Sequence, residues 1–214
     1  MKTKILLLFI FGALNQNMMA QNDIFSNLEL GGKAGINLAS AYSDHYNNLN
    51  TKYGIYFGGF AVYQINDKIS FMSELYYSSQ GYKRTKTFEG IAEVHKYTEK
   101  LNYLNIPLLL RYTAMDKLHV YAGPQFGFLL SAKYRRIVLY EGETKQDDTW
   151  DIKEKRSSTG FDFVIGASYD ITDNISADLR YVYGLKDIDI CEVCKKVEKT
   201  RMIQIGVTYK INLK

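Results

Sequence analysis

Apolar and polar residues alternate along two neighbouring segments in the middle of the chain, residues 101–112 and 118–133. In the first segment a leucine, isoleucine or tyrosine occupies every second position, and Asn105 and Arg111 fall between them. Side chains of a β-strand point alternately to its two faces, so each segment predicts a strand with one apolar face. Crossing a bilayer as a tilted strand takes about 9 to 11 residues. We therefore predict a transmembrane β-hairpin.

The same alternation recurs along the rest of the chain and predicts eight strands: 28–39, 53–65, 69–81, 101–112, 118–133, 159–171, 175–185 and 200–213. Their connections alternate between three short turns and four long polar segments, as in outer-membrane barrels. The long segment 82–100 is charged but still partly alternating, so we expect a hairpin that rises out of the membrane, and 134–158 is a second charged extension. An even number of strands lets the first pair with the last and removes the sheet edge. The predicted fold is all-β: an eight-stranded antiparallel up-and-down transmembrane β-barrel.

An internal repeat settles the facing of the second strand, 53–65, which its glycines leave ambiguous. The sequence YQINDKIS at 63–70 matches YDITDNIS at 169–176, each a strand end, a polar turn and a strand start. The inward faces are then rich in Gly, Ser, Asn and Gln, and include Ser131 and Lys133. They also carry a few charges: Lys33, Glu74, Arg111, Asp162, Asp178 and Arg180. A soluble barrel of lipocalin type is the alternative, but its water-exposed face would carry more lysine and glutamate.

The inward charges predict a closed lumen. By the repeat, Glu74 corresponds in height to Arg180, Asp178 lies two residues from Arg180 on the same face, and Arg111 lies on the strand next to Glu74. Charges desolvated together must pair, because an unpaired one costs several kcal/mol. We expect these four residues to form one network that plugs the barrel.

The N-terminal residues have the parts of a secretory signal peptide. A basic start is followed by the apolar run 5–14 and by the small residue Ala20. We expect a signal peptide at 1–20 and a barrel domain at 21–214. The formal net charge of +4 comes without a clustered basic face in the sequence, so we expect no nucleic-acid partner.

Candidate chemistry is sparse. His45, His95 and His119 are scattered, so we expect no metal site, no cofactor and no enzymatic activity. The alternatives are an outer-membrane enzyme acting on lipid, which would use His95 or His119, and a small channel. Cys191 and Cys194 form a CxxC motif in a long connection, which favours a disulfide over half of a metal site.

Four segments resemble the PorT-like outer-membrane β-barrel family: SFMSELYYSSQG, LNYLNIPLLLRY, HVYAGPQFGFLLSAK and ADLRYVYGL. The hairpin around Pro107 and Pro124 is the most specific part, and we expect local bulges at both prolines because each removes a ladder hydrogen bond. The last strand is similar to the terminal signal read by the barrel assembly machinery, at Gln204, Gly206, Tyr209 and Ile211. The resemblance implies a barrel in the outer membrane, and brings no assigned activity.

Together these patterns predict a small, monomeric barrel with a structural or surface-interaction role carried by its extracellular loops. The expected partners are outer-membrane lipid and lipopolysaccharide, and the barrel assembly machinery during biogenesis. The extracellular partner is not indicated by any motif.

Overall fold

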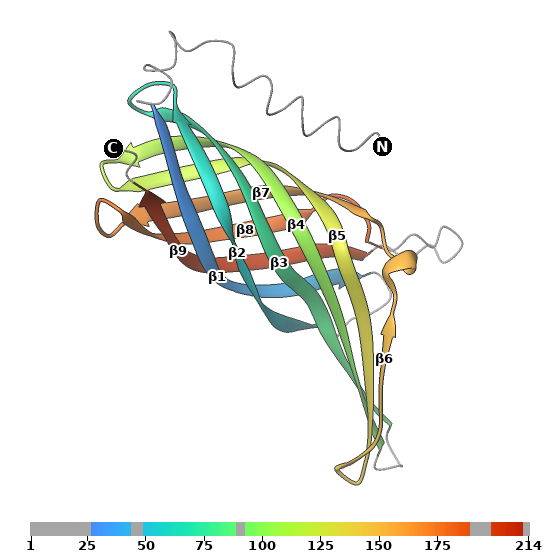
Figure 1. Cartoon of the computed structure of the whole chain (residues 1–214). Coiled ribbons are helices and arrows are strands. Elements are labelled where there is room, and N and C mark those ends of the chain that lie inside the picture. The colour runs from blue at the N-terminus through green and yellow to red at the C-terminus, as the bar shows by residue number, and fades with distance from the viewer. Residues whose placement is uncertain (1–26, 44–48, 89–92, 189–197, 212–214) are drawn as a thin grey trace.

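The computed structural model describes residues 27–43, 49–88, 93–188 and 198–211, which contain nine antiparallel strands. Eight of them close into a ring in the order β1-β2-β3-β4-β5-β7-β8-β9, with β9 paired back to β1 (Figure 1). The predicted eight-stranded barrel is therefore confirmed. β6 lies outside the ring and pairs with β5 alone among the described strands. The strands are β1 Leu28–Ser43, β2 Leu49–Gln64, β3 Ile69–Phe88, β4 Glu93–Met115, β5 Leu118–Tyr140, β6 Glu143–Asp151, β7 Thr159–Asp170, β8 Ile175–Gly184 and β9 Glu198–Ile211.

The two matching sequence segments form the same turn. In each, at 65–69 and 171–175, two successive N–H groups donate to the carbonyl of the isoleucine that begins the next strand. A side-chain oxygen, Asn66 Oδ1 in the first turn and Thr172 Oγ1 in the second, accepts from the N–H groups two and three residues further on. The repeat therefore encodes both the register of the hairpin and the facing of the strands on either side.

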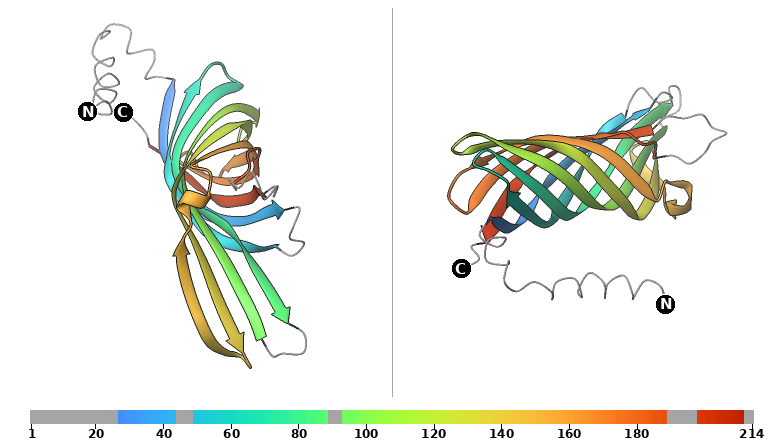
Figure 2. Two further views of the ribbon diagram at one scale, coloured as in Figure 1. Left: turned by 90° about the vertical axis from the view of Figure 1, so that its right-hand side faces the viewer. Right: turned by 90° about the horizontal axis from the view of Figure 1, so that it is seen from above.

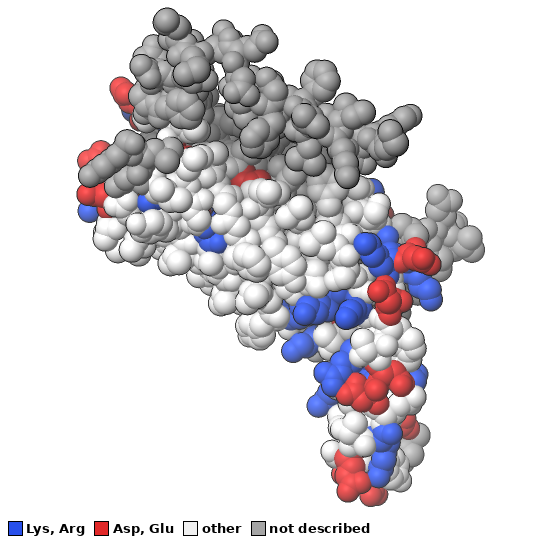
Figure 3. All heavy atoms as spheres, in the orientation of Figure 1, with Lys and Arg blue, Asp and Glu red and all other residues white. Residues whose placement is uncertain are grey.

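The outer wall of the ring is apolar. Its exposed side chains are those that the alternation assigned to the outside, among them Ile36, Ile55, Phe57, Leu75, Leu110, Phe128, Ile165, Leu179, Ile205 and Val207. Aromatic residues next to the short turns are also exposed and form a girdle: Tyr63, Phe71, Tyr112, Tyr169 and Tyr209. In Figure 3 the barrel appears as an almost uncharged belt. In a bilayer this outer wall contacts lipid instead of water, and its apolar side chains require that environment. No helix among the described residues is long and apolar enough to cross a membrane.

Glycines on the inner wall make room for large rings. A Cβ added to Gly166 would lie 2.6 Å from the ring of Tyr121, and one added to Gly31 would lie 2.3 Å from that of Phe60. Both rings are buried, and each lies over the glycine that pairs with its residue on the neighbouring strand. Small and large inward residues thus alternate between neighbouring strands and fill the narrow interior.

Two expectations for the central hairpin are wrong. The register of β4 runs unbroken past Pro107, and that of β5 against β7 runs unbroken past Pro124, so neither proline marks a bulge. One register shift lies instead beside the turn, between Thr113 and Met115, and the other lies where Asn102 pairs with Ser131 but Tyr103 pairs with Leu129. The extra residue in β5 inverts the alternation above it, as a bulge does.

The inversion reverses the predicted facing of the upper part of β5. Ala132 becomes buried, and Lys133, which we placed on the inner face, is exposed on the outside. The polar character of Lys133 did not indicate the inversion, because above the bilayer a lysine is as favourable on the outer face of a strand as on the inner face.

Three ring strands continue well beyond the ring and, with β6, form a four-stranded sheet that we call the external sheet: 83–88, 93–100, 133–140 and β6. This sheet projects from one side of the barrel (Figure 2). The first hairpin was predicted as such. In the second, β5 turns into β6 through Glu141 and Gly142, both at positive φ (52° and 84°), as a two-residue hairpin turn with right-handed strand twist requires.

Candidate functional site

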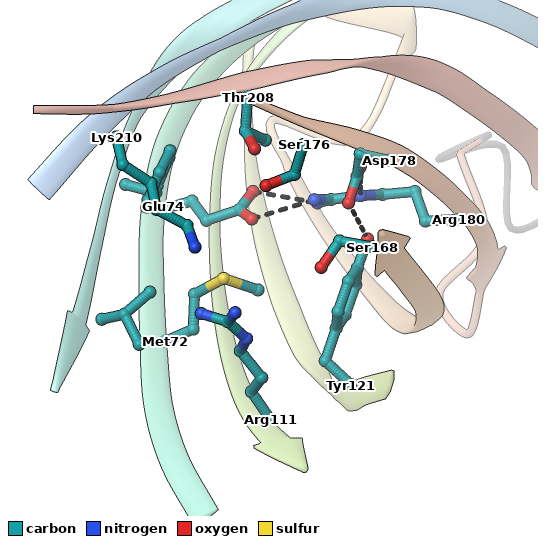
Figure 4. Close-up of a pocket in the computed structure, with 12 residues that line it drawn as sticks. Met72, Glu74, Arg111, Tyr121, Ser168, Ser176, Asp178, Arg180, Thr208 and Lys210 are labelled. Carbon is teal, nitrogen blue, oxygen red and sulfur yellow. Dashed lines mark hydrogen bonds and ion pairs between the residues drawn. The ribbon is translucent and has the colours of Figure 1, made fainter. Parts of the chain in front are cut away.

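A layer of paired charges crosses the middle of the lumen. Arg180, on β8, donates from both terminal nitrogens to the carboxylate of Glu74, on β3, at 2.9 Å each. The Nε of Arg180 donates to Asp178 at 3.1 Å. In the ring order β3 and β8 are four steps apart and face each other, so this ion pair spans the full width of the barrel (Figure 4).

The same layer receives side chains from the two strands at right angles to this pair. Lys33, on β1, donates to both oxygens of Glu74 at 3.0 and 2.9 Å. Tyr121, on β5, donates to Asp178 at 2.5 Å, and its ring lies 5.1 Å from the guanidinium of Arg180. Two cations and two anions therefore balance at the axis, and all four side chains are at most 3% exposed. This layer, defined by these five residues, is the central layer.

Arg111 does not belong to the central layer, although we expected it there. It pairs with Ser70 across β3 and β4, four residues from Glu74, which puts it about 13 Å nearer the short turns. Its Nη1 lies 3.6 Å from Glu29. Arg111 does lie on the strand next to Glu74, as predicted. The position of a residue along the barrel axis depends on the register between the strands, however, and not on which strands are neighbours. Lys33 takes the place that we gave to Arg111.

A second layer, of amide and hydroxyl groups with the carboxylate of Asp162, lies directly above the central layer. Tyr76 donates to Gln125 at 2.7 Å, and the amide of Gln125 donates to Asp162 at 2.8 Å. On the other side Gln204 donates to Asn37 at 2.8 Å. These groups come from β3, β5, β7, β9 and β1, so hydrogen bonds tie most of the ring together through its interior.

The outer mouth of the barrel is covered by the segment that follows β6. There Arg156 donates to Glu99 at 2.6 and 2.7 Å, and Tyr82 donates to the same carboxylate at 2.9 Å. Next to this group, Ile152 and Ile188 from two connecting segments pack on an apolar cluster of the inner wall: Leu101, Tyr103, Leu129 and Ala132. Chain and side chains therefore lie across part of this end of the barrel.

The opposite end holds a small open pocket below the central layer (Figure 4). Near it, Asp170 accepts from Ser176 at 2.5 Å and from His119 at 3.2 Å. The acid thus lies between the serine and the histidine, whereas a nucleophile must bond to the histidine that activates it. His95, in the external sheet, bonds to Glu93 at 2.5 Å and Tyr97 at 3.0 Å. No group of three metal-binding side chains occurs in the described part of the chain.

The external sheet has two different faces. On the side that continues the inner wall, rings follow one another across the strands: Tyr97 to Tyr134 at 5.9 Å between centroids, and Tyr134 to Trp150 at 6.1 Å. Arg84 lies 4.6 Å from the ring of Tyr97, and Arg136 lies 5.3 Å from that of Trp150. We call this the aromatic face. The other side is mostly lysine, arginine and threonine.

Two further sets of residues from the sequence can be placed only in part. Cys191 and Cys194 lie outside the described residues. In β9, Gln204 points into the lumen and is fully buried, whereas Tyr209 and Ile211 are exposed on the outer wall. Gly206 lies against Tyr56, whose hydroxyl would be 2.3 Å from an added Cβ. The glycine at this position leaves room for Tyr56 where β9 closes the ring against β1. The assembly role of these residues stays a prediction.

Two buried tyrosines of the lumen, Tyr121 and Tyr56, make a matched test of the hydrogen bonds. Removing the hydroxyl in Tyr121→Phe should lower the free energy of unfolding by about 1 to 3 kcal/mol, because Asp178 loses a donor in a desolvated site. The hydroxyl of Tyr56 has no hydrogen-bond partner among the described residues, so Tyr56→Phe should leave the stability unchanged or raise it. Urea unfolding in lipid vesicles measures both. Equal losses for the two variants would contradict this account of the lumen.

Comparisons with known proteins agree with this architecture. A family model described as an outer membrane protein beta-barrel domain matches residues 17–189. No curated protein matches the sequence. Among solved structures, the attachment invasion locus protein Ail of Yersinia pestis is 14% identical over 86% of this chain and 98% of its own, with a TM-score of 0.47. Neisserial surface protein A is 18% identical over 85% and 97%, with a TM-score of 0.49.

The N-terminal β-barrel domain of Pseudomonas aeruginosa OprF is similar in the same way, at 14% identity over 84% of this chain and 97% of its own, with a TM-score of 0.36. At these identities the structural likeness concerns the fold alone. The family match covers most of the chain, including the ring strands β1 to β8. The chain therefore belongs to the outer membrane protein β-barrel domain family and lies in the cell outer membrane.

Proposed function

We propose that this protein is a non-conducting, monomeric barrel that holds the external sheet at the cell surface, where the aromatic face contacts an extracellular partner. The observation that carries the proposal is the length of β3, β4 and β5. Their ring portions match the other strands, and the additional residues, with β6, build a sheet that the barrel does not need for closure.

The side chains that fill the lumen support an anchoring role over transport. An interior of eight strands is only just filled by side chains, and here the central layer and the covered outer mouth occupy it. Of the two alternatives, a channel needs a continuous wet path. An enzyme needs a serine bonded to its histidine, and His119 and Ser176 bond to Asp170 instead. The likeness to PorT-like barrels supports a place in that branch of the family and adds no activity.

A shortened variant tests the proposal. Residues 83–98 are replaced by Asn-Gly, which joins Tyr82 to Glu99, and residues 135–149 are replaced by Asn-Gly, which joins Tyr134 to Trp150. Both cuts remove paired residues from both strands, so the register of the ring is kept. The variant should still fold, shown by its heat-modified gel mobility. Cells that display the full chain should be retained on a surface coated with the partner, and cells that display the shortened variant should not.

A matched pair of triple variants assigns the contact to one face. Tyr97→Ser, Tyr134→Ser and Trp150→Ser on the aromatic face should abolish retention. Serine in place of three apolar residues on the other face, Val94, Ile137 and Leu139, should not. Retention by the shortened variant, or steady conductance of the full chain in planar bilayers, would overturn the proposal.

We also propose that Cys191 and Cys194 are oxidised to each other in the mature protein. An extracellular segment meets an oxidising environment, and a CxxC pair closes a small loop. Freshly purified protein should resist alkylation until it is reduced. Complete labelling of both thiols before reduction would refute the disulfide.

A further inference from the structure

The outer surface changes abruptly from apolar to basic along two neighbouring strands. On β4 the outward residues run from Leu108 through Leu104 to Asn102, and the next is Lys100. On β5 they run from Phe128 to Leu130, and after the bulge the next exposed residue is Lys133. The positive charge therefore begins where the lipid-facing wall ends, and Figure 3 shows blue spheres gathered at this boundary.

Cross-strand pairing gathers five basic residues on this outer side of the external sheet. Lys100 pairs with Lys133, and the next row pairs Lys83 with Thr98 and Thr98 with Arg135. One row further out, Lys96 lies opposite Ile137. Directly paired residues of a sheet point to the same side, so these cations lie together above the apolar wall. We call this set the basic face: Lys83, Lys96, Lys100, Lys133 and Arg135.

The four lysines of the basic face form no ion pair with any residue that the structure describes, and all four are exposed. Arg135 differs, because Asp147 on β6 accepts two hydrogen bonds from it, at 2.8 and 2.5 Å. Like charges held on adjacent strands repel one another. Asp151 of β6 pairs with Lys133 on the same side, so one carboxylate of the chain lies beside these cations. Anions from outside the chain would offset the repulsion that remains among the lysines.

We propose that the basic face binds the phosphate groups of a phosphorylated glycolipid of the outer leaflet, whose acyl chains lie against the apolar wall below. Charge and position support this occupant, since lipid phosphates lie at the level where the apolar surface ends. The hydroxyls of Thr85, Thr98 and Thr149 alternate with the basic side chains on the same side of the sheet. They provide hydrogen-bond partners for sugars that rise above the phosphates.

The inference is independent of the extracellular partner. The glycolipid lies on the outer side of the external sheet, whereas the partner contacts the aromatic face on the inner side. A lipid held there also fixes the tilt of the sheet relative to the membrane, because phosphates bind at a single level of the bilayer.

The test compares the full chain with a variant in which the four unpaired lysines become glutamine: Lys83→Gln, Lys96→Gln, Lys100→Gln and Lys133→Gln. The matched control also loses four positive charges, at exposed lysines elsewhere: Lys68, Lys117, Lys145 and Lys155, each changed to glutamine. Each protein is reconstituted in phosphatidylcholine nanodiscs. Binding is measured with bisphosphorylated lipid A, with the same lipid after removal of its phosphates, and with phosphatidylglycerol.

The full chain and the control should bind bisphosphorylated lipid A alike, and the four-lysine variant should bind it at least about tenfold more weakly. Dephosphorylated lipid A should bind weakly to all three proteins, and added salt should reduce binding to the full chain. Equal binding by all three proteins would overturn the site. Phosphatidylglycerol bound as tightly as lipid A would overturn the glycolipid as its occupant.

Discussion

Replacing Arg180 by alanine is expected to cost about 3 to 5 kcal/mol of unfolding free energy, because it leaves Glu74 and Asp178 buried beside a single remaining cation, Lys33. The carboxylate of Glu74 loses two hydrogen bonds at once. Urea midpoints of the protein folded in vesicles measure the loss. The double variant Arg180→Ala with Glu74→Ala should lose less than the sum of the two single variants, since the two side chains contact each other.

Arg201→Ala is the matched control. Arg201 lies on the outer side of β9, exposed, with its guanidinium 4.8 Å from the ring of Tyr42. Surface contacts of this kind contribute about 0.5 to 1 kcal/mol. If Arg180→Ala and Arg201→Ala shifted the urea midpoint equally, the central layer would be a wet and dispensable arrangement.

A charge placed on the middle of the outer wall should destabilise the protein nearly as much. Leu179 is 54% exposed and lies near the centre of β8, where Leu179→Arg should cost about 2 to 4 kcal/mol if lipid surrounds it. In a barrel surrounded by water the same change would be neutral. The measurement is unfolding in phosphatidylcholine vesicles, and the same variant in a mild detergent shows whether the ring still closes.

Ile171→Arg gives the depth control. Ile171 is 56% exposed, like Leu179, but it lies in a short turn next to the aromatic girdle. Near the interface an arginine costs only about 0 to 1 kcal/mol. Equal costs at Ile171 and Leu179 would argue against a bilayer around the ring.

The alternation of side chains was sufficient to predict the ring and its two faces. Period two is imposed by the backbone itself, so Glu74, Arg180 and Gln204 could be assigned to the lumen without knowing any contact. The repeat at 63–70 and 169–176 then gave the height of Glu74 relative to Arg180. Both of these signals are local, which is why they could be read from the chain.

The errors came from features that depend on the register between strands. Arg111 was placed one strand away from Glu74, but the pairing of β3 with β4 sets it four residues lower. Lys33 was assigned to the lumen but left out of the network, because Glu74, Asp178, Arg111 and Arg180 already balance in charge and nothing in the sequence required another cation. The bulge opposite Asn102 inverts the facing of Lys133, and no turn residue marks it.

The external sheet has a consequence for how these proteins behave when crowded. Closing the ring removes every sheet edge inside the membrane, but β6 restores one outside, with its second side unpaired in the described structure. An open edge is a template for another copy of the same strand. Five of its nine residues are charged, Glu143, Lys145, Asp147, Asp148 and Asp151, and stacking such strands costs charge repulsion and desolvation. The charges of β6 therefore disfavour pairing of its open edge with β6 of a neighbouring molecule, and so prevent the formation of fibres at the cell surface.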